Sequence, residues 1–307
     1  MNVNELNGDL RELYCNRSSF QVPDYGTIKT KTAIWKLGPI FSERESWDVN
    51  DDLYHAYITE AAGVCVATQV EGPTPGVQGI AKIRMQIPND YDVPAPTKPQ
   101  KSSFRTSLEV LSLKELTEAG STCTPKLLDL AFFKQIRKND PLPGGFLTFI
   151  IMERLPGRNL VNFHELPMSE RDQVRLAFAK TIREFYARGY THWDPHRRNL
   201  MWDREDKKCY IIDLEDVCQL DDDYPRKVFT PERDFQVWGI ADPEINTGSF
   251  GLDPMVPHDC KFIQDPGDEE LEKMARDVTG KPLYFESKSR GECQPSENTS
   301  TTVVESS

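Results

Sequence analysis

The chain has 307 residues, with 37 Lys and Arg against 49 Asp and Glu, a formal net charge of −12 and 38% hydrophobic residues. This length is enough for one large domain or two smaller lobes that bury a core. The negative charge argues against general affinity for nucleic acid or anionic lipid, because those partners require a basic surface. We therefore expect no nucleic-acid partner and no membrane partner.

The pattern of apolar residues and the spacing of the cysteines both predict an intracellular protein. No stretch approaches about 18 consecutive apolar residues, and the first residues are polar and acidic, unlike a secretory signal. The expected location is the cytoplasm. The seven cysteines are scattered and include no C-x-x-C, so they indicate reduced thiols and neither a disulfide framework nor a zinc site.

Composition changes at both ends of the chain and once in the middle. Residues 1–40 have mixed composition and are expected to form an N-terminal extension. Residues 286–307 are polar and rich in Ser and Thr, which predicts a disordered tail. Residues 88–103 are rich in proline and predict a loop between a strand and a helix.

The first half of the chain predicts five strands and one helix. Two β-favouring runs within residues 53–70 flank Glu60-Ala61-Ala62-Gly63, a pattern typical of a hairpin. The predicted helix contains Glu109 at the start of one face and ends before Gly120. The other expected elements are a strand at 77–86, that helix at 106–119, and strands at 126–133 and 146–153.

The second half begins with a long amphipathic helix. Residues 169–188 have apolar residues at helical spacing, with Ser169 placed to cap the first turn. Two short apolar runs, 199–202 and 209–214, then flank a charged turn and predict a hairpin. Polar residues stand beside both of these strands.

The string HWDPHRRN (residues 192–199) is followed fourteen residues later by Asp213 at the end of an apolar strand. Phosphoryl transfer from ATP requires a carboxylate that accepts the proton of the attacking hydroxyl, and an amide oxygen and second carboxylate that hold Mg²⁺. Asp194 suits the first role, and Asn199 and Asp213 suit the second. A carboxylate ending so apolar a run is costly to bury unless it is paired or binds metal.

This H-x-D-x-x-x-x-N string, followed by a strand ending in D-L-E, resembles the catalytic signature of the protein-kinase-like superfamily. The D-L-E variant is more similar to the aminoglycoside phosphotransferase and choline kinase branch. The segments STCTPKLLDL, PGGFLTFIIMERLPG and RNLMWD are similar to uncharacterised fungal kinase-like proteins. The resemblance covers roughly residues 55–240.

The resemblance implies an α+β, two-lobed kinase-like fold. Residues 41–152 would form an N-lobe with a five-stranded antiparallel sheet and one helix, and residues 153–285 a reduced, mainly helical C-lobe with the catalytic loop. Lys82 would hold the α- and β-phosphates of ATP, and Glu109 would pair with Lys82. The interlobe hinge, whose backbone would receive the adenine, would comprise Met152, Glu153 and Leu155.

The catalytic loop matches the family with some differences. Asp194 would be the catalytic base, with His192 bracing the loop and His196 standing where Ser/Thr kinases usually carry a lysine that touches the transferred phosphate. No G-x-G-x-x-G precedes Lys82, and no A-P-E follows Asp213. We therefore expect ATP- and Mg²⁺-dependent transfer of the γ-phosphate to a hydroxyl acceptor, a small molecule in preference to a protein, without control by activation-loop phosphorylation.

Two other interpretations of the same residues remain open. A pseudokinase would bind nucleotide or a protein partner and transfer nothing, which the missing glycine loop favours. The H-x-D-x-H formed by His192, Asp194 and His196 could instead bind a transition metal, as in a metallohydrolase, but it leaves Asn199 and Asp213 without roles.

Overall fold

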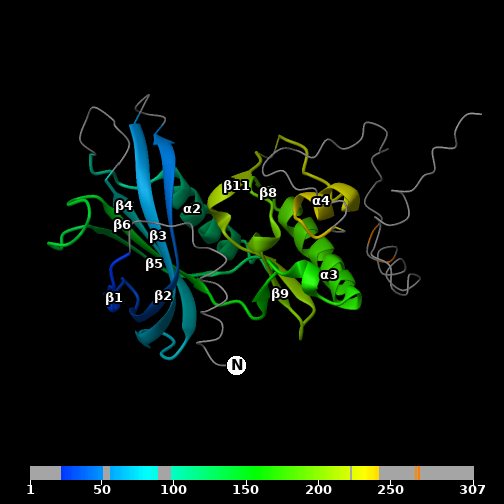
Figure 1. Ribbon diagram of the computed structural model, residues 1–307, viewed down its shortest axis with the longest axis horizontal. Coiled ribbons are helices and arrows are strands. Elements are labelled where there is room, and N and C mark those ends of the chain that lie inside the picture. Colours follow the sequence, from blue (N-terminus) through cyan, green and yellow to red (C-terminus); the bar gives the residue numbers. More distant parts are fainter. Residues whose placement is uncertain are drawn as a thin grey trace, which may run out of the picture.

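The computed structural model describes residues 22–50, 56–88, 98–221 and 223–241, together with residues 267 and 269. A large antiparallel sheet forms one side of the molecule, and the long helix α3 (Met168–Ala187) lies on the other (Figure 1). The expected tail at 286–307 lies outside the described residues.

The large sheet has six strands in the order β1-β2-β3-β4-β6-β5, all antiparallel to their neighbours. The expectation of five strands is therefore corrected. The sheet also begins at residue 27, so residues 27–40 belong to it and not to an extension. The strands are β1 (Thr27–Lys29), β2 (Ile34–Asn50), β3 (Ala56–Glu71), β4 (Gln78–Ile87), β5 (Leu127–Lys134) and β6 (Phe146–Glu153).

The hairpin expected at residues 60–63 is wrong, because these residues lie inside the unbroken strand β3. Ala61 and Ala62 are buried, and a Cβ added at Gly63 would lie 3.1 Å from the side chain of Val22. The small residues therefore mark close packing over the strand. Glu60 is also fully buried, which local composition does not predict.

The two ends of the sheet meet through one carboxylate. Asp129 of β5 accepts hydrogen bonds at Oδ2 from Thr30 Oγ1 (2.6 Å), Thr32 Oγ1 (2.9 Å) and Trp35 Nε1 (2.8 Å). Thr30 and Thr32 lie in the turn between β1 and β2. The sheet is thus curled around an apolar cluster that includes Trp35 and Phe149.

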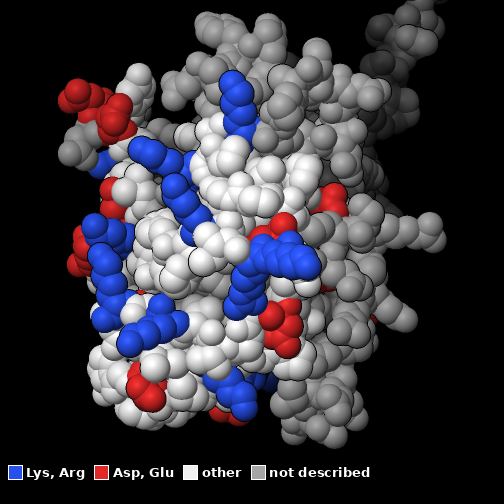
Figure 2. Space-filling model, turned by 90° about the vertical axis from the view of Figure 1, so that its left-hand side faces the viewer, with Lys and Arg blue, Asp and Glu red and all other residues white. Residues whose placement is uncertain are grey.

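The side of the sheet that carries β1 and the β5–β6 turn is rich in basic residues. Lys29, Lys134, Arg137 and Lys138 are exposed there, and Lys and Arg side chains are prominent on this face in Figure 2. The formal charge of −12 is the sum over the whole chain, so it does not describe this face.

Helix α2 (Phe104–Glu118) follows the proline-rich segment and lies against the sheet (Figure 1). Ser103 caps it, accepting a hydrogen bond from the Thr106 backbone N–H at 3.0 Å. The helix begins two residues before the predicted start, and Gly120 follows it with φ of +67°. Its buried face includes Glu109 and Leu113.

The described C-terminal residues combine two helices with short strands. Ser169 lies inside α3, whose N-cap is Pro167, so Ser169 is not the cap. Helix α4 (Pro231–Val237) packs nearby through contacts such as Phe178 with Phe235. A mainly helical lobe is not confirmed, because the same region contains five strands: β7 (Arg158–Asn159), β8 (Tyr190–His192), β9 (Leu200–Asp203), β10 (Lys208–Ile211) and β11 (Val217–Gln219).

A second apolar cluster joins the two halves of the chain. It contains Leu113 and Leu116 of α2 and Ile150 of β6 together with Phe178 and Phe185 of α3. Helix α2 is therefore fixed by packing to the C-terminal elements as well as to the sheet. This packing places the residues of α2 beside the hairpin of β9 and β10.

Four cysteines lie among the described residues, and all four are free thiols, as expected. Cys65, Cys123 and Cys209 are buried. Burial raises the pKa of the Cys65 thiol to about 11 and that of Cys123 to about 12, so both stay protonated at neutral pH. No helix in the described part of the chain is long and apolar enough to cross a membrane.

Candidate active site

Strand β4 supplies two cations to one face of the sheet. Side chains alternate along a strand, and Ala81, Ile83 and Met85 point into the apolar cluster inside the sheet. Lys82 and Arg84 therefore share the opposite face, which is covered by α2 and the turn after β10. Both are buried.

Lys82 joins three elements of the fold. Its Nζ lies 2.6 Å from Glu109 Oε1 of α2 and 3.4 Å from Glu215 Oε2, and it also contacts Asp213. Glu109 is buried, and the Lys82 side chain is only 10% exposed. The ion pair of Lys82 with Glu109, which the family resemblance implies, is present.

Asp213 stands two residues after β10 in a left-handed conformation, with φ of 64° and ψ of 59°. The preceding residue, Ile212, donates its backbone N–H to the Asn199 carbonyl at 2.9 Å, which ties this turn to the start of β9. Burial alone would raise the pKa of the Asp213 carboxyl, but Lys82 and Arg44 hold the pKa well below its usual range. The carboxylate is therefore ionised at neutral pH.

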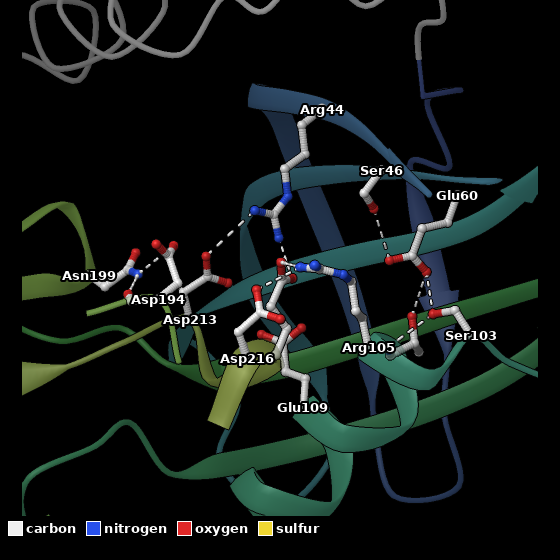
Figure 3. Close-up of polar contacts among 12 residues, drawn as sticks. Arg44, Ser46, Glu60, Ser103, Arg105, Glu109, Asp194, Asn199, Asp213 and Asp216 are labelled. Atoms are coloured by element: carbon white, nitrogen blue, oxygen red, sulfur yellow. Dashed lines mark hydrogen bonds and ion pairs between the residues drawn. The ribbon is translucent and has the colours of Figure 1, made fainter. Parts of the chain in front are cut away.

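Asp194 lies in the turn between β8 and the short 3-10 helix η2 (Arg197–Asn199). Asn199 Nδ2 donates to the Asp194 carbonyl at 2.9 Å and to its Oδ2 at 3.3 Å (Figure 3), and Arg198 Nη2 lies 2.6 Å from the same Oδ2. Burial opposes ionisation, but Arg198 and Asn199 bring the pKa of Asp194 below its ordinary value. The side chain is 40% exposed, so it is open to a ligand.

The two histidines of the loop are engaged with the backbone. His192 Nδ1 accepts a hydrogen bond from the Asp194 N–H at 3.1 Å, and its Nε2 lies 3.4 Å from the Ile212 carbonyl. His196 Nδ1 accepts from the Arg198 N–H at 3.1 Å. Burial lowers the pKa of both rings, so both are neutral. Within the described residues, no group of three or more His, Cys, Asp or Glu is placed to hold a metal ion.

The residues expected at the hinge lie where β6 ends. Met152 is paired with Ile80 and Glu153 with Gly79, two and three residues beyond the pairing of Ile150 with Lys82. The strands approach closely there, since a Cβ at Gly79 would lie 2.8 Å from the Met152 carbonyl oxygen. The Glu153 N–H donates to the Lys126 carbonyl at 2.8 Å, and Leu155 follows, partly buried.

Arg84 is the centre of a charged cluster that the sequence analysis missed. Its Nη1 lies 2.6 Å from Glu60 Oε1 and its Nη2 2.7 Å from Glu109 Oε2, and it also contacts Glu215. The Arg84 side chain is fully buried. Period-two alternation from Lys82 was the available signal, because it places residue 84 on the same face.

Glu60 completes this cluster at the end farther from Asp213. Its Oε2 accepts hydrogen bonds from Ser103 Oγ at 2.6 Å and Thr106 Oγ1 at 2.9 Å, and Ser46 Oγ lies 3.3 Å from Oε1 (Figure 3). Burial would raise its pKa, but Arg84 and the Ser103 and Thr106 hydroxyls lower it overall. Glu60 is thus a buried anion with a complete set of partners.

Two partly exposed arginines close the cluster on the side of the turn after Asp213. Arg44 of β2 contacts Glu215 and lies 3.6 Å from Asp213 Oδ2. Arg105 of α2 lies 2.6 Å from Asp216 Oδ2 and 3.3 Å from Glu215 Oε1. The arrangement offers cations for an anionic ligand, and oxygen atoms on Asn199 and Asp213 for a hard cation.

Comparisons with known proteins give little further information. No family model and no curated protein matches this sequence. Matching solved structures include the kinase PK-1 of Cydia pomonella granulovirus, which is 14% identical with a TM-score of 0.33, over 52% of this chain and 48% of that one. The chain thus spans about half the length of that kinase. Assignment of a function depends on the geometry of the site itself.

Proposed function

We propose that the chain is an ATP- and Mg²⁺-dependent phosphotransferase that transfers the γ-phosphate to a hydroxyl group. The observation that carries the proposal is the meeting of Lys82, Glu109 and Asp213, which come from a strand, a helix and the turn after a hairpin. Phosphoryl transfer depends on positioning and charge stabilisation, and a lysine held by a glutamate beside a metal-binding carboxylate supplies both.

Asn199 and Asp213 fit Mg²⁺ by their chemistry. Mg²⁺ prefers oxygen ligands, and the Asp213 carboxylate is ionised. Asn199 uses its Nδ2 for Asp194, so its amide oxygen is the end of the group that remains for a cation. When bound, Mg²⁺ would neutralise charge on the phosphates and orient them.

Lys82 would bind the α- and β-phosphate oxygens. Glu109 holds its Nζ, and Arg84 in turn holds the second oxygen of Glu109, so the lysine is fixed before any ligand arrives. Such preorganisation reduces the ordering cost of binding. The backbone at Met152, Glu153 and Leu155 would receive the adenine.

Asp194 would act as the base that orients the acceptor hydroxyl. The hydroxyl oxygen would attack the γ-phosphorus, the bond from that phosphorus to the β-phosphate oxygen would break, and the hydroxyl proton would pass to Asp194. Arg198, 2.6 Å from the Asp194 carboxylate, keeps it ionised and adds positive charge near the transferred group. The absence of A-P-E after Asp213 favours a small-molecule acceptor over a protein.

A pseudokinase is the second candidate function. The ion pairs of Asp213 with Lys82 and Arg44 favour it, because they compete with a metal ion for the same carboxylate. Such a module would bind nucleotide or a protein partner and transfer nothing.

Two measurements distinguish the candidate functions. The first is a titration with ATP in which binding is monitored by thermal unfolding, and the second is an assay of phosphate transfer. Wild type should be stabilised by ATP only when Mg²⁺ is present, by about 2.7 kcal/mol at a hundredfold excess over Kd. Asp213→Ala should lose this shift. Asp194→Asn should keep it and lose transfer by about a hundredfold or more.

Asp206→Asn provides the matched control, because Asp206 is exposed in the turn of the same β9–β10 hairpin. It should behave as wild type. An Mg²⁺-dependent shift without transfer to any hydroxyl acceptor would favour the pseudokinase. Equal loss of binding and transfer in Asp194→Asn would contradict the base role of Asp194.

A further inference from the structure

The β2–β3 hairpin brings an arginine to the metal-binding side of the site. Arg44 is paired with Ala62 on β3, and Lys82 is paired with Val64 on the same strand, so the two cations lie at nearly the same level of the sheet. Figure 3 shows Arg44 reaching from its strand toward Asp213. Its side chain is 36% exposed, against 10% for Lys82, so Arg44 is the more accessible of the two.

Asp213 is shared by both cations. Lys82 contacts Oδ1, and Arg44 Nη1 lies 3.6 Å from Oδ2. If the carboxylate binds Mg²⁺, Arg44 loses part of its anionic environment. Arg44 would keep its closer contact with Glu215, and a nucleotide polyphosphate arriving with the metal would bring several negative charges to replace that of Asp213.

We propose that Arg44 is a phosphate-binding residue of the nucleotide site: in the free chain it contacts Glu215 and lies beside Asp213, and when Mg²⁺ and nucleotide bind it exchanges Asp213 for a β- or γ-phosphate oxygen. This inference rests on the proposed function. No G-x-G-x-x-G precedes Lys82, so a glycine loop does not supply backbone donors over the phosphates. A planar guanidinium, with paired N–H donors, matches phosphate oxygens well.

The other arginines of the cluster are not placed for this exchange. Arg84 is fully buried and contacts three carboxylates. Arg105 contacts Glu215, as Arg44 does, but its second partner is Asp216 at 2.6 Å and not Asp213. Its side chain is 32% exposed, nearly as much as that of Arg44. Arg105 is therefore a matched control for charge, exposure and contact with Glu215.

Titration calorimetry of the full chain with Mg·ATP and with AMP tests the proposal. Arg44→Ala should weaken Mg·ATP binding by about tenfold to a hundredfold, because a charge-assisted hydrogen bond to a terminal phosphate is lost. AMP, which lacks those phosphates, should bind within about twofold of wild type. Arg44→Lys should recover part of the Mg·ATP affinity, since it keeps the charge without the fork of donors.

Each other outcome has a definite meaning. An unchanged Mg·ATP affinity in Arg44→Ala would overturn the inference and leave the proposed function intact. Equal losses for Mg·ATP and AMP would make Arg44 a structural brace, and the same loss in Arg105→Ala would show a general charge effect; both overturn it. Failure of wild type to bind Mg·ATP would overturn the inference together with the proposed function.

Discussion

The cluster around Arg84 and the loop around Asp194 are built from the same contact in different surroundings. In both, an arginine nitrogen lies 2.6 Å from a carboxylate oxygen. Arg84 and Glu60 are fully buried, whereas the Asp194 and Arg198 side chains are 40% and 37% exposed. The distance between the nitrogen and oxygen atoms therefore does not determine how much an ion pair contributes to stability. The buried contact fixes how sheet and helix meet, and the exposed one is able to change partners.

Replacing Arg84 should give the largest effect. Arg84→Ala would leave Glu60, Glu109 and Glu215 without their shared cation in a buried site, and breaking such a pair costs about 3–5 kcal/mol. Denaturant unfolding at pH 7 measures this loss. Arg198→Ala removes a contact of equal length near solvent and should cost under about 1 kcal/mol. Similar losses in the two variants would contradict the comparison.

A smaller effect is expected from Glu60→Gln, and it should depend on pH. The pKa of Glu60 is lower in the folded chain than its ordinary value, so the ionised group stabilises the fold above that value, about 4.3. This stabilisation is lost as the pH falls toward the folded pKa. The advantage of wild type over Glu60→Gln in unfolding free energy should therefore shrink from about pH 5 downward. A difference that stays constant with pH would contradict the ionised state of Glu60.

The smallest effect on stability, with a clear effect on chemistry, is expected at Arg198. Burial opposes the charge of Asp194, and Arg198 offsets it, so Arg198→Ala should raise the pKa of Asp194. If Asp194 is the base, the acid limb of the transfer rate against pH should move to higher pH. Arg198→Lys keeps the charge and should move it less. An unmoved limb in Arg198→Ala would argue against Asp194 as the base.

The local sequence pattern predicts those features of the fold and the site that depend on a single helix, strand or hairpin. The sequence pattern places Lys82 on a strand and Glu109 on one face of a helix, whereas their pairing is what the family resemblance implies; the structure brings them within 2.6 Å. The predicted strand 146–153 and the hairpin of β9 and β10 are also present. In these cases the residue type, the period and the turn agree within a short segment.

The remaining features of the site depend on contacts between residues that are distant in the sequence. Arg84 meets Glu60 across 24 residues and Glu215 across 131, and nothing near Glu60 in sequence indicates a buried cation. The neighbouring Ala61-Ala62-Gly63 matches the pattern of a turn, because small residues serve both turns and close packing. The pairing of these residues with both β2 and β4, and the position of Val22 over Gly63, distinguish the two.

The order of strands in the large sheet has a consequence for how the chain folds. Strand β6 lies between β4 and β5, so β5 has no neighbouring strand in the sheet until residues 146–153 are available. Asp129 can therefore reach Thr30, 99 residues earlier, in its native place only after β6 has inserted. Such distant contacts form slowly. During synthesis the curled sheet should therefore close only after β6 has been made.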